Sequence, residues 1–407
     1  MGSMISSGCK WAMLMVLTKF VAVEMVGHYV LALSITAPVI MLSRLQLRVV
    51  QATDVQNLNK FADFFGVRLL TNCIAILIIF GILVSLAGRY DFRVYVIIFI
   101  IALNKTIEST SDITYGLMQK HERMDNVARS MVFRDAGAVI LLAVIIKVTG
   151  NLLLGVMGIG LWWSLVLLLF DRSNTRNFAK FIPSFKLKKV LSLAKIGLPL
   201  GIVMGIISVN SNIPRYFVEI YIDSEALGYF GPLVYVLVGV SKATIALGQS
   251  ASVRLARYYV YNRGAYVKLL LKMLFIILML AFGIILFGVF LGKPFLAIAY
   301  KPEYAERHDL FVWLMAASGV TMLASVLGYG MTAARRFKSQ VPVLGSTCAV
   351  CLLACWLLVP RYGMKGAAWA MLLSATTQFL GSLIVVVHSL MQPARQEKIS
   401  KRDGENG

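Results

Sequence analysis

Long apolar runs dominate this sequence of 407 residues, and they constrain its fold more than any other feature. Twelve runs have about the 20 residues that a helix needs to cross the hydrocarbon core of a bilayer. With 59% apolar and only 14% charged residues, the composition is too apolar for an ordinary soluble domain. We expect an all-α integral membrane protein and not a β-barrel, whose strands would alternate with period two. The runs cover residues 5–23, 27–50, 66–88, 93–118, 127–147, 152–170, 196–221, 227–250, 267–292, 308–333, 341–359 and 366–390.

Basic residues gather in alternate connections between these runs. They are frequent at 171–195, 251–268 and 334–340, whereas 221–228 has acids and no base. Cytoplasmic connections carry the excess of Lys and Arg, so we expect these connections and both termini in the cytoplasm. The net charge of +21 then reflects orientation and not nucleic acid binding. The start of the chain lacks the pattern of a cleavable signal peptide. The tail is basic too, through Arg395, Lys398, Lys401 and Arg402.

Three segments of the first half recur in the second half in the same order. "EMVGHY" at 24–29 matches "EALGYF" at 225–230, "TYGLM" at 114–118 matches "GYGMT" at 328–332, and "GVMGIGLWWSLVLLL" at 155–169 matches "GMKGAAWAMLLS" at 363–374. Six spans per half give both halves the same orientation, so we expect two lobes related by a pseudo-two-fold axis along the membrane normal. The expected division is an N-terminal lobe at 1–170, a basic cytoplasmic linker at 171–195, a C-terminal lobe at 196–391 and a polar tail at 392–407.

The run at 93–118 carries charges where a membrane helix is normally apolar. Lys105, Glu108 and Asp112 are spaced to share one helical face, and Tyr115 and Gln119 extend it. Charges at this depth are costly and therefore face protein or a water-filled cavity. Two interpretations stay open: the face lines a transport cavity, or Lys105 and Glu108 neutralise each other within the helix as a structural brace.

Other spans also place polar side chains inside the membrane. Arg44 and Arg48 lie one turn apart and cannot neutralise each other, although Arg48 can also extend to the membrane edge. The basic residues modestly outnumber the acids, which suits an anionic ligand such as a phosphate. Arg215 and Glu219 have the spacing of a helical ion pair, and Pro199 and Pro214 predict interruptions of their helix, a feature of transporter substrate sites. The further candidates are Arg134, Asp135, Asn210, Asn212, Tyr216 and Lys242.

Signatures of enzymes and cofactors are missing. The sequence has no HExxH, no GxSxG and no glycine-rich phosphate loop. We therefore expect no enzyme, no catalytic residue, no cofactor and no metal. Cys348, Cys351 and Cys355 include a CxxC spacing, but without a fourth ligand nearby we interpret them as a packing stripe.

Several stretches resemble a known family over nearly the whole chain. "EMVGHYVLALSITAPVIMLSRLQLRVVQATD", "ESTSDITYGLMQKHERMD", "NIPRYFVEIYIDSEALGYFGPL" and "LGQSASVRLARYY" are similar to the Wzx-type oligosaccharide flippases. These form the polysaccharide-export branch of the MOP (multidrug/oligosaccharidyl-lipid/polysaccharide, MATE-like) superfamily. The resemblance implies two six-helix lobes, a cationic central cavity and the bacterial inner membrane. Members usually have a longer first helix than the run at 5–23.

This resemblance implies a flippase that moves an undecaprenyl-pyrophosphate-linked oligosaccharide by alternating access, for O-antigen, capsule or exopolysaccharide. Its partners would be this lipid-linked oligosaccharide, membrane lipids and other polysaccharide-assembly proteins, with coupling to H⁺ or Na⁺ left open. Two other classes are a cation-coupled drug exporter, which should have an acidic cavity, and a polysaccharide polymerase or ligase, which would need a large external loop. The residues expected to attract the anionic head are Arg44, Arg48, Lys105, Arg134, Arg215 and Lys242. Those expected to hold a coupling ion or line the cavity are Glu108, Asp112, Tyr115, Asn210, Asn212 and Glu219.

The charge pattern makes a prediction about topology. The connection at 171–195 should face the cytoplasm because of its basic residues. A single cysteine placed there should react with an impermeant thiol reagent only after the cells are opened. Labelling from outside intact cells would contradict the assignment.

Overall fold

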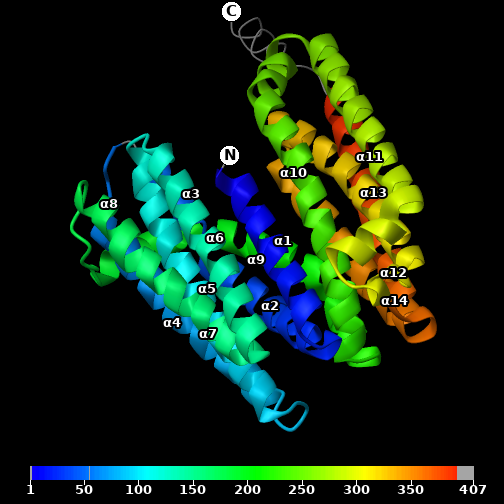
Figure 1. Ribbon diagram of the computed structural model, residues 1–407. Helices are drawn as coiled ribbons and strands as arrows, with labels where there is room; N and C mark the ends of the chain where they lie inside the picture. Colours follow the sequence, from blue (N-terminus) through cyan, green and yellow to red (C-terminus); the bar gives the residue numbers. More distant parts are fainter. Residues whose placement is uncertain (1, 55, 392–407) are drawn as a thin grey trace, which may run out of the picture. The chain divides into compact units, whose positions relative to one another are not determined.

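A computed structural model describes residues 2–54 and 56–391, and within this part every regular element is a helix (Figure 1). Nine of the described helices are long and apolar enough to cross a membrane. The expectation of an all-α membrane protein is therefore confirmed. The basic tail expected at 392–407 lies outside the described residues.

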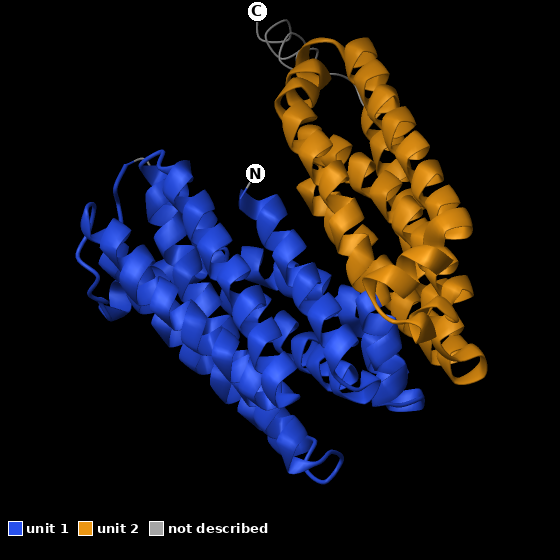
Figure 2. Ribbon diagram, viewed as in Figure 1, with its two compact units in different colours: residues 1–232 blue, residues 233–407 orange. Residues whose placement is uncertain are grey.

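Two compact units divide the chain, one up to Pro232 and one from Leu233 onward (Figure 2). The boundary lies within the helix α10 (Ser224–Tyr261). The sequence instead places a boundary at 171–195, and that division into lobes stays a prediction. The first unit holds α1 (Gly2–Phe20), α2 (Val23–Ser43), α3 (Leu47–Ala52), α4 (Phe61–Ser85), α5 (Phe92–Lys120), α6 (Met124–Thr149), α7 (Leu152–Leu165), the π-helical segment η1 (Val166–Asp171), α8 (Arg172–Arg176), α9 (Leu187–Tyr221) and the start of α10.

The helix expected over 27–50 is interrupted. Leu45 and Gln46 both have a φ of 48°, in the left-handed region, and this turns the chain between the end of α2 and the start of α3. Arg44 therefore lies at the end of one helix and Arg48 in the first turn of the next. Each arginine approaches a different part of α5, which packs against both α2 and α3.

The helix α9 differs from expectation in the opposite way. It is continuous from Leu187 to Tyr221 and includes both Pro199 and Pro214. The interruption that these prolines predict is not observed, so the argument from a broken helix to a substrate site does not hold for α9. It packs along α2, and the hydroxyl of Tyr216 donates a hydrogen bond of 2.5 Å to the carbonyl oxygen of Ser34.

The two motifs "EMVGHY" and "EALGYF" meet each other at the start of α2 and α10. A Cβ on Gly27 would lie 1.7 Å from the carbonyl oxygen of Ser224, and a Cβ on Gly228 would lie 2.1 Å from the carbonyl oxygen of Val23. Gly27 and Gly228 occupy the same place in the two motifs, and Val23 and Ser224 each directly precede one of the motifs. The contact is therefore reciprocal, and only glycine permits it.

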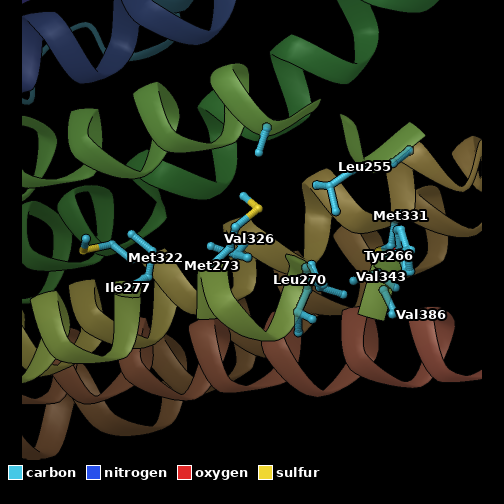
Figure 3. Packing of buried hydrophobic residues seen from close by; sticks show 13 residues of the cluster. Leu255, Tyr266, Leu270, Met273, Ile277, Met322, Val326, Met331, Val343 and Val386 are labelled. Carbon is cyan, nitrogen blue, oxygen red and sulfur yellow. The ribbon is translucent and has the colours of Figure 1, made fainter. Parts of the chain in front are cut away.

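The second unit is built around a core of apolar side chains from α10, α11 (Arg263–Ala299), α13 (His308–Ala333) and α14 (Phe337–Met391) (Figure 3). A single turn, α12 (Pro302–Ala305), precedes α13. The long α14 contains two of the expected spans, because the chain reverses at Gly363, which has a φ of 59°. The hydroxyl of Ser374 donates a hydrogen bond of 3.2 Å to the carbonyl oxygen of Thr347, and this bond joins the parts of α14 before and after Gly363.

The glycine contact makes a prediction about stability. In Gly27→Ala the added methyl group must push α2 away from the backbone of Ser224, so we expect the free energy of unfolding to fall by about 1–3 kcal/mol. The matched control is Gly81→Ala in α4, where a Cβ meets no atom within 4 Å and alanine favours the helix. Thermal unfolding in detergent should separate the two variants. Equal melting temperatures would contradict the close contact.

A cationic cluster around Glu108 as the candidate functional site

One carboxylate in the middle of α5 is shared by four basic side chains. The Oε1 atom of Glu108 lies 2.6 Å from the Nζ atom of Lys10 and 3.7 Å from an Nη atom of Arg134. Its Oε2 atom lies 2.9 Å from Lys105 Nζ and 3.6 Å from an Nη atom of Arg44. Glu108 is buried, so these charges interact in surroundings of low dielectric constant. The cations come from α1, the end of α2, α5 and α6, and Glu108 therefore links four segments.

The next carboxylate along the same face of α5, Asp112, lies between two arginines. Its Oδ1 atom is 3.3 Å from Arg48 Nη1, and its Oδ2 atom is 3.9 Å from Arg68 Nη2. Arg48 also donates to the side-chain oxygen of Gln119 at 3.3 Å and lies over the ring of Tyr115 at 5.6 Å. Arg68 in α4 is fully buried, and none of its guanidinium nitrogens has a hydrogen-bond partner among residues 2–54 and 56–391. Asp112 is thus the carboxylate that compensates this buried charge.

The helix α6 contributes the pair of Arg134 and Asp135, which are neighbours in sequence. Arg134 binds the Asp135 carboxylate through Nε at 2.9 Å and Nη2 at 3.2 Å, and Asp135 also accepts a hydrogen bond from Ser6 of α1. The guanidinium group of Arg134 lies 5.3 Å from the ring centre of Trp163 and 6.0 Å from that of Tyr115. These aromatic rings hold the guanidinium group of Arg134 in place without neutralising its charge.

A chain of hydroxyl groups extends from the cluster to the π-helical segment. Arg134 Nη1 lies 3.5 Å from the hydroxyl of Tyr115, which lies 2.8 Å from Ser130 Oγ. Ser130 in turn donates a hydrogen bond of 2.5 Å to Asp171, which is fully buried. The sequence predicts Asp171 as the first residue of a cytoplasmic linker, but the helix continues through it to Arg176.

Positive charge exceeds negative charge in this cluster. Six basic side chains face four acidic ones, so this set of side chains has a net charge of +2 even with every carboxylate ionised. We call this set the Glu108 cluster: Lys10, Arg44, Arg48, Arg68, Lys105 and Arg134 with Glu108, Asp112, Asp135 and Asp171. Within the part of the chain that the structure describes, no group of three His, Cys, Asp or Glu side chains is arranged to hold a metal ion. The surplus suits an anionic group.

The other predicted site residues lie elsewhere. Asn210, Asn212 and Arg215 are on α9, where Arg215 Nη1 donates a hydrogen bond of 2.7 Å to Asn212 Oδ1. Glu219 is near the end of α9, where its Oε1 atom accepts a hydrogen bond of 2.7 Å from Ser224. Lys242 belongs to the second unit. The structure therefore brings together Arg44, Arg48, Lys105, Arg134, Glu108, Asp112 and Tyr115.

Three members of the Glu108 cluster, and the neighbouring Trp163, were not predicted as site residues. From the sequence, Lys10 is interpreted only as an interruption of the first apolar run, and Asp171 as the first residue of the predicted linker. Arg68 lies near the start of an apolar run, where arginine is typically at the membrane edge, and Trp163 reads as an ordinary apolar residue. A signal existed for Lys10 and Arg68, since each is a basic residue within or beside a span and needs a partner.

Comparisons with known proteins agree with this architecture. A family described as polysaccharide biosynthesis protein matches residues 1–253. The capsular polysaccharide biosynthesis protein CapF of Staphylococcus aureus is 25% identical over 376 residues, which cover 91% of this chain and 93% of that protein.

Two solved structures have a similar fold. The lipid II flippase MurJ, in an inward closed conformation, has a TM-score of 0.74 at 12% identity, with coverage of 96% of this chain and 90% of that one. An inward-facing multidrug resistance MATE family transporter of the MOP superfamily has a TM-score of 0.68 at 10% identity, with coverage of 95% and 94%. The expected fold of the MOP superfamily is confirmed. Because the family match extends over more than half of the 407 residues, the chain belongs to the polysaccharide biosynthesis protein family.

Proposed function

We propose that this protein is a flippase, and that it moves an oligosaccharide linked to undecaprenyl pyrophosphate across the cytoplasmic membrane by alternating access. The oligosaccharide is a repeat unit of a surface polysaccharide such as capsule, O-antigen or exopolysaccharide. The family description and the name of the relative CapF support a role in polysaccharide assembly. The fold shared with a lipid II flippase supports transport of a lipid-linked sugar and not an enzymatic reaction.

The observation that carries this proposal is the sharing of Glu108 by four cations. A single carboxylate cannot satisfy Lys10, Lys105, Arg44 and Arg134 together, and the distances of 3.6 and 3.7 Å to the two arginines are longer than charge-assisted hydrogen bonds. A pyrophosphate brings more negative charge and more acceptor oxygens than a carboxylate. It would therefore form shorter, bidentate contacts with guanidinium groups that Glu108 holds in place.

Arginine in particular suits this role at Arg44 and Arg48. The side chains are 17% and 24% exposed, so they are neither fully exposed nor fully enclosed, and among the described residues Arg44 Nε has no hydrogen-bond partner. Their carboxylate partners compete with a bound phosphate and thereby limit how tightly it is held. A transporter must release its cargo, and an exchange between phosphate and carboxylate provides for that release.

The same charge balance disfavours an exporter of cationic drugs. Such a cargo would meet a surplus of positive charge in the Glu108 cluster, and bringing like charges together is unfavourable. The MATE transporter likeness concerns the fold alone and does not alter this argument.

Substitution of Arg48 tests the binding of the anionic head. Arg48→Ala should reduce export of the surface polysaccharide at least tenfold, because a guanidinium contact to phosphate is lost, and Arg48→Lys should restore part of it. The measurement is the amount of surface glycan in a strain that depends on the variant, together with the lipid-linked repeat that accumulates inside.

The control for this experiment is Arg123→Ala, which removes an arginine that is half exposed and paired with Asp125 outside the cluster. Export should stay at the wild-type level in this variant. Equal export by Arg48→Ala and wild type would contradict the role of Arg48 in binding.

A second prediction separates stability from transport at Asp112. Asp112→Asn leaves the fully buried Arg68 without its carboxylate, so the free energy of unfolding should fall by about 3 kcal/mol. Replacing Arg68 by Met in the same protein should restore the melting temperature, since the unpaired charge is gone. Export should stay low in the double variant, because Arg48 still lacks the carboxylate that orients it. A double variant no more stable than Asp112→Asn would contradict this assignment.

A further inference from the structure

A second polar site lies in the first unit, far along α5 from the Glu108 cluster. It is a pocket of about 500 Å³ at the end of the unit where α2, α5 and α10 begin and α9 ends. Val94 lines this pocket and precedes Glu108 by 14 residues of α5, or about 21 Å at 1.5 Å per residue. The lining residues are Glu24, His28, Arg89, Tyr90, Asp91, Val94, Glu219, Asp223, Ser224 and Glu225. Five carboxylates thus face one guanidinium group, so the polarity is opposite to that of the Glu108 cluster.

Four of the five carboxylates have an ordinary structural explanation. Glu24 and Glu225 lie in the first turns of α2 and α10, and Asp91 is the residue that precedes the first turn of α5. The carboxylate of Asp223 accepts a hydrogen bond of 2.7 Å from the backbone N–H of Ala226. Acidic side chains at the starts of helices are stabilised by the unpaired N–H groups and the helix dipole. These four residues alone would not indicate a ligand.

The fifth carboxylate, Glu219, has no such explanation. It lies in the last turn of α9, where the helix dipole disfavours negative charge. The residue is 7% exposed, and within the part of the chain that is described its buried Oε2 atom has no hydrogen-bond partner, while Oε1 accepts a hydrogen bond from Ser224. A buried carboxylate oxygen without a partner is costly, and such a group in a native protein calls for a ligand or another functional reason.

The charge of Glu219 acts on the other side chains of the pocket. Burial, followed by the negative charge of Glu219 and a hydrogen bond to its carboxylate, raises the pKa of Tyr90 to about 12. Tyr90 thus keeps its proton at physiological pH and adds no negative charge to the pocket. Arg89 lies over the ring of Tyr90 at 6.0 Å, and His28 lies 3.9 Å from Glu24.

We propose that this pocket binds the ammonium group of a small organic cation, with Glu219 as its buried counter-charge. A bare metal ion fits less well, because no three carboxylate or imidazole groups of the described residues are arranged around one point. The volume is that of a pocket for a small molecule. An ammonium group would donate to Glu219 Oε2 and satisfy it. This inference does not depend on the proposed transport of a glycan.

Two sources could supply this chemistry, a free amine or the ethanolamine head group of a lipid. The full chain purified in detergent is heated with increasing ethanolamine, which serves as the free probe. In parallel, the chain is reconstituted in nanodiscs that contain either phosphatidylethanolamine or phosphatidylglycerol. The measurement in both arms is the change in melting temperature, relative to each variant without the probe or the lipid.

The proposal predicts that ethanolamine, phosphatidylethanolamine or both stabilise the wild-type protein, whereas ethylene glycol, which has a similar size and no ammonium group, does not. In Glu219→Gln the half-maximal concentration of ethanolamine should rise roughly 30-fold or more, as for loss of one partner of a buried charge pair. If only the lipid stabilises the wild-type protein, and Glu219→Gln loses this stabilisation, the ligand of the pocket is the lipid head group. Asp125→Asn is the control, since this carboxylate is 46% exposed, pairs with Arg123 and does not line the pocket, and it should keep the effect.

Three results would overturn the proposal. They are stabilisation by neither probe, equal stabilisation of wild type and Glu219→Gln, and stabilisation by ethylene glycol or phosphatidylglycerol equal to that by ethanolamine or phosphatidylethanolamine. The last comparison uses only the wild-type protein and decides the matter even if Glu219→Gln does not fold. Because none of these measurements involves glycan export, their outcome is independent of the flippase assignment.

Discussion

The carboxylate of Glu108 is the interaction on which the first unit depends. In a membrane helix one buried charge requires compensation, and four cations from four segments meet at this single residue. Each cation alone would be costly in lipid, and together they repel one another, so the position of the carboxylate determines how α1, α2, α5 and α6 approach. The basic side chains of the Glu108 cluster outnumber its carboxylates, so the cluster has a net positive charge. In the proposed flippase, this surplus would hold the charge needed for binding in place before the anionic cargo arrives.

The sequence predicts much of this cluster because helical spacing is regular. Lys105, Glu108 and Asp112 follow one face of α5, and that face can be read from residue numbers alone. The break at Leu45 and Gln46 could not be predicted, since neither residue favours a left-handed conformation and tertiary contacts impose it. Long-range partners such as Arg68 and Asp171 were missed for a related reason: their role depends on the packing of α4 and η1 against α5, which no local pattern records. The continuity of α9 through two prolines is likewise set by its packing against α2 and α4.

The first unit separates its charges along the length of its helices. The Glu108 cluster has an excess of positive charge, whereas the pocket near the start of α5 is lined by five carboxylates and one arginine. Because α5 contributes to both, the two sites have a fixed separation for as long as that helix stays straight. This distribution of charge favours an anion at the Glu108 cluster and a cation at the pocket. A cargo with a pyrophosphate would therefore experience attraction in the cluster and repulsion near the pocket.

The reciprocal contact of Gly27 and Gly228 has the form of a homodimer interface contained within one polypeptide. In a true homodimer every substitution is made twice, so a residue such as Glu219 could not stand on one side of the contact without its copy on the other. Joining the repeats in one chain removes that restriction. The same offset that relates Gly27 to Gly228 relates Thr18 to Glu219, and the threonine merely donates its hydroxyl to a backbone carbonyl of its own helix. The two segments thus share the glycine contact but differ nine residues before it, where the second carries the carboxylate of Glu219 that lines the pocket.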